Sequence, residues 1–140
     1  MKKSMCFAGL LSVVVALVLA APAVAQLNSY TISVPFSFNV NAHVLPAGEY
    51  VVHVVAPGAV QIRGVDHIAN ATFLAPALLS RPLHASPNAK LVFHRYGRMY
   101  FLAQVWFSDV NDGYELTITN TEREYAQQTP STETVLRAAK

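Results

Sequence analysis

The chain has one cysteine, little charge and one tryptophan among its 140 residues. Cys6 lies near the N-terminus, so the rest of the chain has neither a disulfide partner nor a thiol for catalysis or a zinc site. A Gly-x-Ser-x-Gly nucleophile turn is also missing. We therefore name no catalytic residue and expect no cofactor.

The first 25 residues have the layout of a cleavable export signal. Lys2 and Lys3 precede an apolar stretch, Met5–Ala21, and Ala23-Val24-Ala25 has the small-x-small pattern of a cleavage site. The stretch is shorter than the roughly 20 apolar residues of a membrane-spanning helix. We predict cleavage after Ala25, which gives a periplasmic or secreted protein with no stable membrane anchor.

Cleavage leaves 115 residues, a length that suits one domain over residues 26–140. It removes two of the ten basic side chains and balances the other eight against eight acidic ones. The formal charge is then close to zero, so the composition gives no electrostatic reason to expect nucleic acid as a partner.

Short stretches of alternating apolar and polar residues, separated by turn residues, run through most of the domain. The predicted strands are 29–40, 49–55, 60–63, 68–74, 91–96, 99–107 and 114–119. Pro35 lacks an N–H group, which places the first strand at a sheet edge or gives it a bulge. Three prolines in 76–88 predict a long irregular connection with a short turn near 77–79. We expect an all-β, mainly antiparallel fold, a small sandwich or barrel of six to eight strands.

Two predicted strands meet at Gly97-Arg98, which has glycine where a two-residue type II′ turn requires it. That turn sets the predicted cross-strand pairs Arg95–Tyr100, His94–Phe101 and Phe93–Leu102. Apolar residues occur on both faces of this hairpin, so we expect both faces to be covered.

The C-terminal segment is predicted to be a short helical tail. Thr121 and Glu124 have capping-box spacing, which starts a polar helix at about residue 121. Pro130 interrupts that helix before Ser131–Ala139.

Three segments together resemble a group of short, uncharacterised secreted bacterial proteins, mostly acidobacterial. They are Val34-Pro35-Phe36-Ser37-Phe38, Leu45-Pro46-Ala47-Gly48-Glu49-Tyr50, and Lys90–Gly97 continued by Tyr100–Trp106. The resemblance covers most of the chain from Val34 to Tyr125. It implies a β-rich fold and no particular function.

The densest polar cluster in the predicted hairpin is His94–Arg98. In a ligand site, Arg95 would bind an anion while Tyr100, across the strand pair, stacks on it. In a structural role, Arg95 and Tyr100 form a cross-strand pair, and His94 packs against Phe101 with a hydrogen bond in the core. Both interpretations use the same predicted register.

Trp106 is a fourth candidate ligand residue. With Phe107, Tyr100 and Tyr114 it could form an aromatic platform for a sugar or a peptide. In so small a domain these rings are also the natural filling of the core.

Three histidines in predicted turns, His43, His67 and His84, are candidate metal ligands. No histidine of the domain lies two or four residues from another, so no single strand or helix presents a ligand pair. A metal site would need the fold to bring these loops together.

The leading hypothesis is an exported, non-enzymatic binding or structural module of the cell envelope, with an unknown protein or glycan ligand. The alternative is a small metal-binding protein or metal-dependent enzyme that uses the loop histidines. A third hypothesis is an assembly or adhesion protein whose edge strand near Val34 accepts a partner strand.

Overall fold

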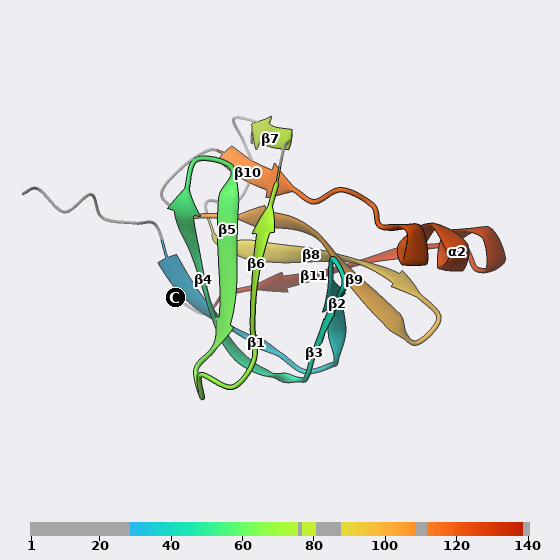
Figure 1. The fold of residues 1–140 in the computed structure, drawn as a ribbon, viewed down its shortest axis with the longest axis horizontal. Helices are drawn as coiled ribbons and strands as arrows, with labels where there is room; N and C mark the ends of the chain where they lie inside the picture. The colour runs from blue at the N-terminus through green and yellow to red at the C-terminus, as the bar shows by residue number, and fades with distance from the viewer. Residues whose placement is uncertain (1–28, 76, 81–87, 109–111, 139–140) are drawn as a thin grey trace, which may run out of the picture.

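The computed structural model describes residues 29–75, 77–80, 88–108 and 112–138. The predicted export signal lies outside these residues. The described chain forms a small β-sandwich-like fold of two sheets with one short helix (Figure 1). Its elements are β1 (Ser29–Val34), β2 (Phe38–Val40), β3 (His43–Leu45), β4 (Gly48–Ala56), β5 (Ala59–Gly64), β6 (Asn70–Leu74), β7 (Ala77–Ser80), β8 (Lys90–Tyr96), β9 (Met99–Trp106), β10 (Asp112–Glu115), α2 (Asn120–Gln128) and β11 (Thr132–Arg137).

The first sheet is antiparallel and has the order β1-β4-β5-β6. Along its outer strands, buried and exposed residues alternate. Ile32 and Val34 of β1 are buried, as are Ala71 and Phe73 of β6, and the residues between and beside them are mostly exposed. One face therefore packs on the core and the other faces solvent.

The second sheet has the order β11-β8-β9-β10-β7, and the β2–β3 hairpin joins it where Asn39 pairs with Phe101 in parallel. In Figure 1 the strands of the two sheets cross each other. Two strands at the middle of this sheet, β8 and β9, have runs of consecutive buried residues. This confirms that both faces of the hairpin are covered.

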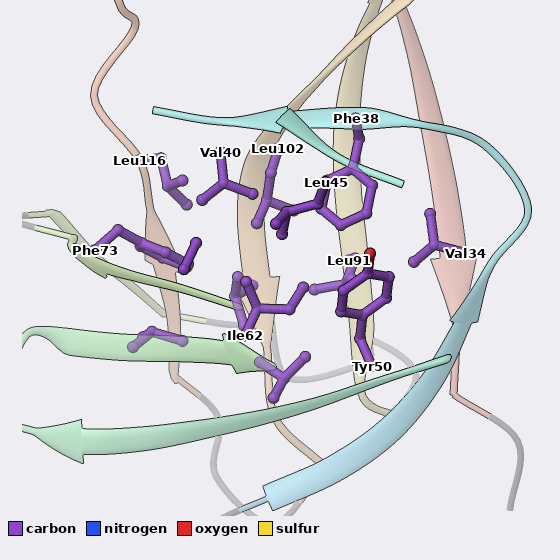
Figure 2. Close-up of a cluster of buried hydrophobic side chains, with 14 of the residues drawn as sticks. Val34, Phe38, Val40, Leu45, Tyr50, Ile62, Phe73, Leu91, Leu102 and Leu116 are labelled. Carbon is purple, nitrogen blue, oxygen red and sulfur yellow. The ribbon is translucent and has the colours of Figure 1, made fainter. Parts of the chain in front are cut away.

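The core lies between the two sheets, and side chains from both point toward one another (Figure 2). Phe38 is its aromatic centre, since its ring meets Tyr50 at 5.3 Å and Phe93 at 5.4 Å between centroids, both edge to face. Such contacts are worth about 0.5–1.5 kcal/mol each beyond the area that they bury. They fix β2 and β4 against β8.

The first predicted strand, 29–40, is divided in the structure. β1 ends at Val34, Pro35–Ser37 cross from one sheet to the other, and β2 begins at Phe38. β1 is a terminal strand of its sheet, which confirms the edge position inferred from Pro35.

The region from residue 77 to residue 119 departs from prediction in two places. Residues 77–80 form strand β7 on β10, where a turn within an irregular connection was expected. β10 ends at Glu115, whereas the strand was predicted to reach Thr119. Because these short strands exist only as partners of neighbouring strands, local sequence carries little signal for them.

The predicted helical tail is also wrong in part. The helix is present, but Thr119 and not Thr121 caps it, with its Oγ1 accepting the Glu122 N–H at 3.2 Å. Residues 132–137 form strand β11 along β8, where we expected helix. Pairing with β8 and the packing of Leu136 against the core favour a strand over a helix in this segment.

The number of strands also differs from the prediction. With β2, β3, β7 and β11 included, the described residues hold more strands than the six to eight predicted.

Candidate functional site

The β8–β9 hairpin positions most of the candidate ligand residues. It has the predicted register, with Arg95 opposite Tyr100, His94 opposite Phe101 and Phe93 opposite Leu102. Gly97 has a φ of +61°, as the first position of a type II′ turn requires. The hairpin tip is therefore a defined platform for side chains.

Arg95 lies across the ring of Tyr100 at this tip. Its Cζ is 5.6 Å from the ring centroid, and its Nε donates a hydrogen bond to the Gly97 carbonyl at 2.8 Å. Phe36, from the crossover between the sheets, stacks on the Tyr100 ring with centroids 3.8 Å apart and 12° between planes. Asn39 Nδ2 also donates to the Tyr100 carbonyl at 3.0 Å. We call Arg95, Tyr100 and Phe36 the tip stack.

The tip stack orients an exposed guanidinium without neutralising it. Within the described part of the chain, Arg95 makes only the contacts with Gly97 and Tyr100, and no carboxylate forms an ion pair with it. Its two Nη groups are therefore available as paired donors, the geometry that suits a carboxylate or a phosphate. Chemically, the tip can hold an anion.

His94 lies on the opposite face of the hairpin, away from Arg95. Its Nδ1 is 2.8 Å from Oε1 of Glu122 on α2, and the Tyr96 hydroxyl donates to the same oxygen at 3.2 Å. Glu122 is only 4% exposed. A carboxylate buried to this extent requires hydrogen-bonding partners, because burying it unpaired would cost roughly several kcal/mol.

This buried cluster attaches α2 to the outer face of β8 and β9. Burial, and after it the nearby Glu122 carboxylate, raises the pKa of Tyr96 above its ordinary value, so the hydroxyl keeps its proton as a donor. Aromatic contacts extend the attachment from Tyr96 to Phe101 at 5.8 Å and from Phe101 to Tyr125 at 5.7 Å. The predicted hydrogen bond of His94 is present, and its acceptor is the helix residue Glu122, which sequence reasoning missed.

Trp106 lies near the other end of β9. The residue is 7% exposed, and its ring covers Gly113 and donates from Nε1 to Gln104 Oε1 at 3.0 Å. Phe107 instead enters the core, where it meets Tyr30 and Tyr114 edge to face. The four rings of the predicted platform therefore do not share one surface.

Two of the three candidate metal ligands, His43 and His67, lie in the described part of the chain. His43 begins β3 and His67 lies in the turn after β5 with a φ of +63°, and both are exposed. His84 lies outside the described residues. Among those described, no three or more His, Cys, Asp or Glu side chains gather where they could hold a metal ion.

A surface cavity of about 340 Å³ lies between the turn at Pro46–Ala47 and the turn after β5. The Tyr50 hydroxyl donates to the Pro46 carbonyl at 2.5 Å beside it. Burial, with a smaller contribution from Asp66, raises the pKa of Tyr50. The cavity is open to solvent, and its lining residues lie in and beside these two turns.

The similarity of this chain to known proteins gives no family. No family model, curated protein or solved structure matches it. None of the helices in the described residues has the length and hydropathy to cross a membrane. Any functional assignment must therefore come from the chain's own residues.

Proposed function

We propose that this chain is an exported, non-enzymatic binding module of the cell envelope. Its tip stack binds an anionic group, a carboxylate or a phosphate, carried by an envelope partner. The observation that carries the proposal is the Arg95 guanidinium, held by the Tyr100 ring and the Gly97 carbonyl with both Nη groups free of described acceptors.

The rigidity of the tip supports a binding role. A free arginine side chain loses about 2 kcal/mol of conformational entropy when a ligand fixes it, and preorganisation lowers that cost. Here Phe36 stacks on Tyr100 and Asn39 holds the Tyr100 backbone, so the surface beneath Arg95 is set before any ligand arrives. Rings of this kind also offer a face on which a sugar or an aromatic group can pack.

The test is calorimetric titration of the mature protein with an acidic peptide, a uronic-acid oligosaccharide and a sugar phosphate. Neutral oligosaccharides serve as the reference. We expect at least one anionic probe to bind, with an affinity that falls as salt is added. Arg95→Gln should weaken that binding by about tenfold or more, because a charge-assisted bidentate contact is lost.

Arg63→Gln is the matched control, since Arg63 is also an exposed strand arginine but lies on β5 of the other sheet. It makes the same change in net charge. Equal binding by the Arg95 and Arg63 variants, or no binding of any anionic probe, would refute the proposal. The three probes also distinguish a peptide, a glycan and a phosphate as the source of the anion.

A further inference from the structure

Strand β6 is a terminal strand of the first sheet, and its outer edge has no partner strand among the described residues. Two hydrogen bonds at the ends of the β5–β6 pair show which backbone groups point outward. The Gly64 N–H donates to the Ala69 carbonyl at 2.6 Å, and the Ala75 N–H donates to the Gly58 carbonyl at 2.8 Å.

In an antiparallel pair, backbone groups alternate along a strand between the partner and the opposite side. Since Ala69 and Ala75 bond toward β5, Ala71 and Phe73 between them do so as well. The N–H and C=O groups of Asn70, Thr72 and Leu74 therefore point to the free edge. Only another extended backbone presents donors and acceptors at the matching spacing.

Within the described part of the chain, this edge shows none of the devices that usually prevent strands from adding to a sheet. Asn70–Leu74 contains no charged residue and no proline, and its pairing with β5 has no bulge. Leu74 is 75% exposed and Ile68, just before the strand, is 84% exposed.

Two other edges are protected. β11 carries the charged residues Glu133 and Arg137. β1 lies beside β11, with the Tyr30 hydroxyl donating to the Lys90 carbonyl across the gap at 3.4 Å. The edge near Val34, which the sequence suggested for strand addition, is therefore less open than the edge of β6.

We propose that β6 pairs with β6 of a second copy of this chain, antiparallel about a two-fold axis at Thr72. Thr72 then faces the Thr72 of its partner, and Asn70 faces Leu74 in both directions. The pairing closes about six backbone hydrogen bonds and joins the two first sheets into one.

A second copy suits this edge because the edge is complementary to itself. The two-fold axis sets each outward N–H against an outward C=O, and no like charges meet. Threonine pairs across antiparallel strands are favourable, and the exposed Leu74 gains cover on the sheet face.

The experiment is sedimentation of the mature protein over about a hundredfold range of concentration. We expect a monomer–dimer equilibrium. Thr72→Pro removes the outward N–H at the axis and leaves the bonds of Ala71 and Phe73 to β5 in place, so the dissociation constant should rise by about tenfold or more.

Thr72→Val is the matched control. Both substitutions lose the hydrogen bond from Gln61 Nε2 to Thr72 Oγ1, but valine keeps the backbone N–H and should still form the dimer. Thr72→Lys keeps the N–H and sets two cations face to face. It should also dissociate the dimer, and it tests the proposal should the proline variant fail to fold.

A mature protein that stays monomeric at every concentration would overturn the proposal, as would a dimer that tolerates both the proline and the lysine variants. Anion binding at the tip stack is measured separately. Its failure leaves this pairing standing, and the reverse also holds.

Discussion

Glu122 is the buried charged residue of the described chain, and its surroundings explain how it can be buried. The carboxylate accepts a hydrogen bond from the Tyr96 hydroxyl and contacts His94. The backbone N–H of Glu122 donates to the Thr119 side chain. These contacts involve a strand, a helix and the helix cap, so one side chain fixes how α2 sits on the sheet.

We expect Glu122→Ala to lower the free energy of unfolding by about 2–4 kcal/mol, because it leaves the buried Tyr96 hydroxyl and the half-buried His94 without their acceptor. Glu122→Gln keeps an acceptor oxygen and should cost less. Urea unfolding measures both.

The control is Glu124→Ala, a change of the same kind at an exposed position of the same helix. It should alter the free energy of unfolding by less than about 0.5 kcal/mol. If the two alanine variants were equally stable, the buried cluster would not be what holds α2 in place.

Residue-level prediction succeeded where partners lie within one hairpin. The Arg95–Tyr100 pair follows from the turn at Gly97, because turn length sets the register. The contact of His94 with Glu122 could not be found this way, since it depends on the direction in which the chain leaves β10 and returns over the sheet.

The turn of the β8–β9 hairpin depends on one glycine, Gly97. Gly97 has a positive φ, and an added Cβ there would meet no other atom within 4 Å. Any cost of substitution therefore comes from the backbone conformation and not from crowding.

We expect Gly97→Ala to lower the free energy of unfolding by about 1 kcal/mol, since L-residues rarely adopt this conformation. Gly97→Asn should lose less, because asparagine tolerates positive φ better. Thermal unfolding of the variants measures the effect.

Gly48→Ala is the comparison, because Gly48 has no positive φ and an added Cβ would make only an ordinary contact with the Tyr50 ring at 3.8 Å. It should be close to neutral. A Gly97→Ala protein as stable as the Gly48→Ala protein would contradict the assigned turn.

Two of the elements that the sequence missed, β11 and β7, depend on a partner strand that is distant in the chain. β11 contains alternating residues, but Thr132–Arg137 is short and largely polar, and its strand form relies on the exposed edge of β8. β7 likewise relies on its partner strand, β10. Where a strand has a strong pattern of its own, as β4 and β9 do, prediction and structure agree to within a residue or two.

At the scale of the whole molecule, the fold is completed without a disulfide from residue 26 onward. The only cysteine lies in the predicted export signal. Stability must come from packing between the two sheets, centred on Phe38, Tyr50 and Phe93. Folding of this part of the chain therefore needs no oxidation step.

The predicted export signal leads to a test at the scale of the whole molecule. We expect the protein recovered outside the cytoplasm to begin at Gln26, and its intact mass measures this. Ala25→Arg should leave an uncleaved precursor, because the site requires a small residue before the cut. Asn28→Ala, beyond the site, should be processed normally. Recovery of the full 140-residue chain outside the cytoplasm would contradict the cleavage.

The sequence by itself determined the β class, the positions of most turns and the register of the β8–β9 hairpin. These features are local, since a period of two residues, a glycine at a turn and a proline at an edge act over a few residues. Tertiary structure alone decided which strands share a sheet, which residues surround Glu122, and that β6 has a single partner strand among the described residues. These depend on contacts between segments far apart in the chain, and such contacts form only when the two sheets bury their apolar faces against each other.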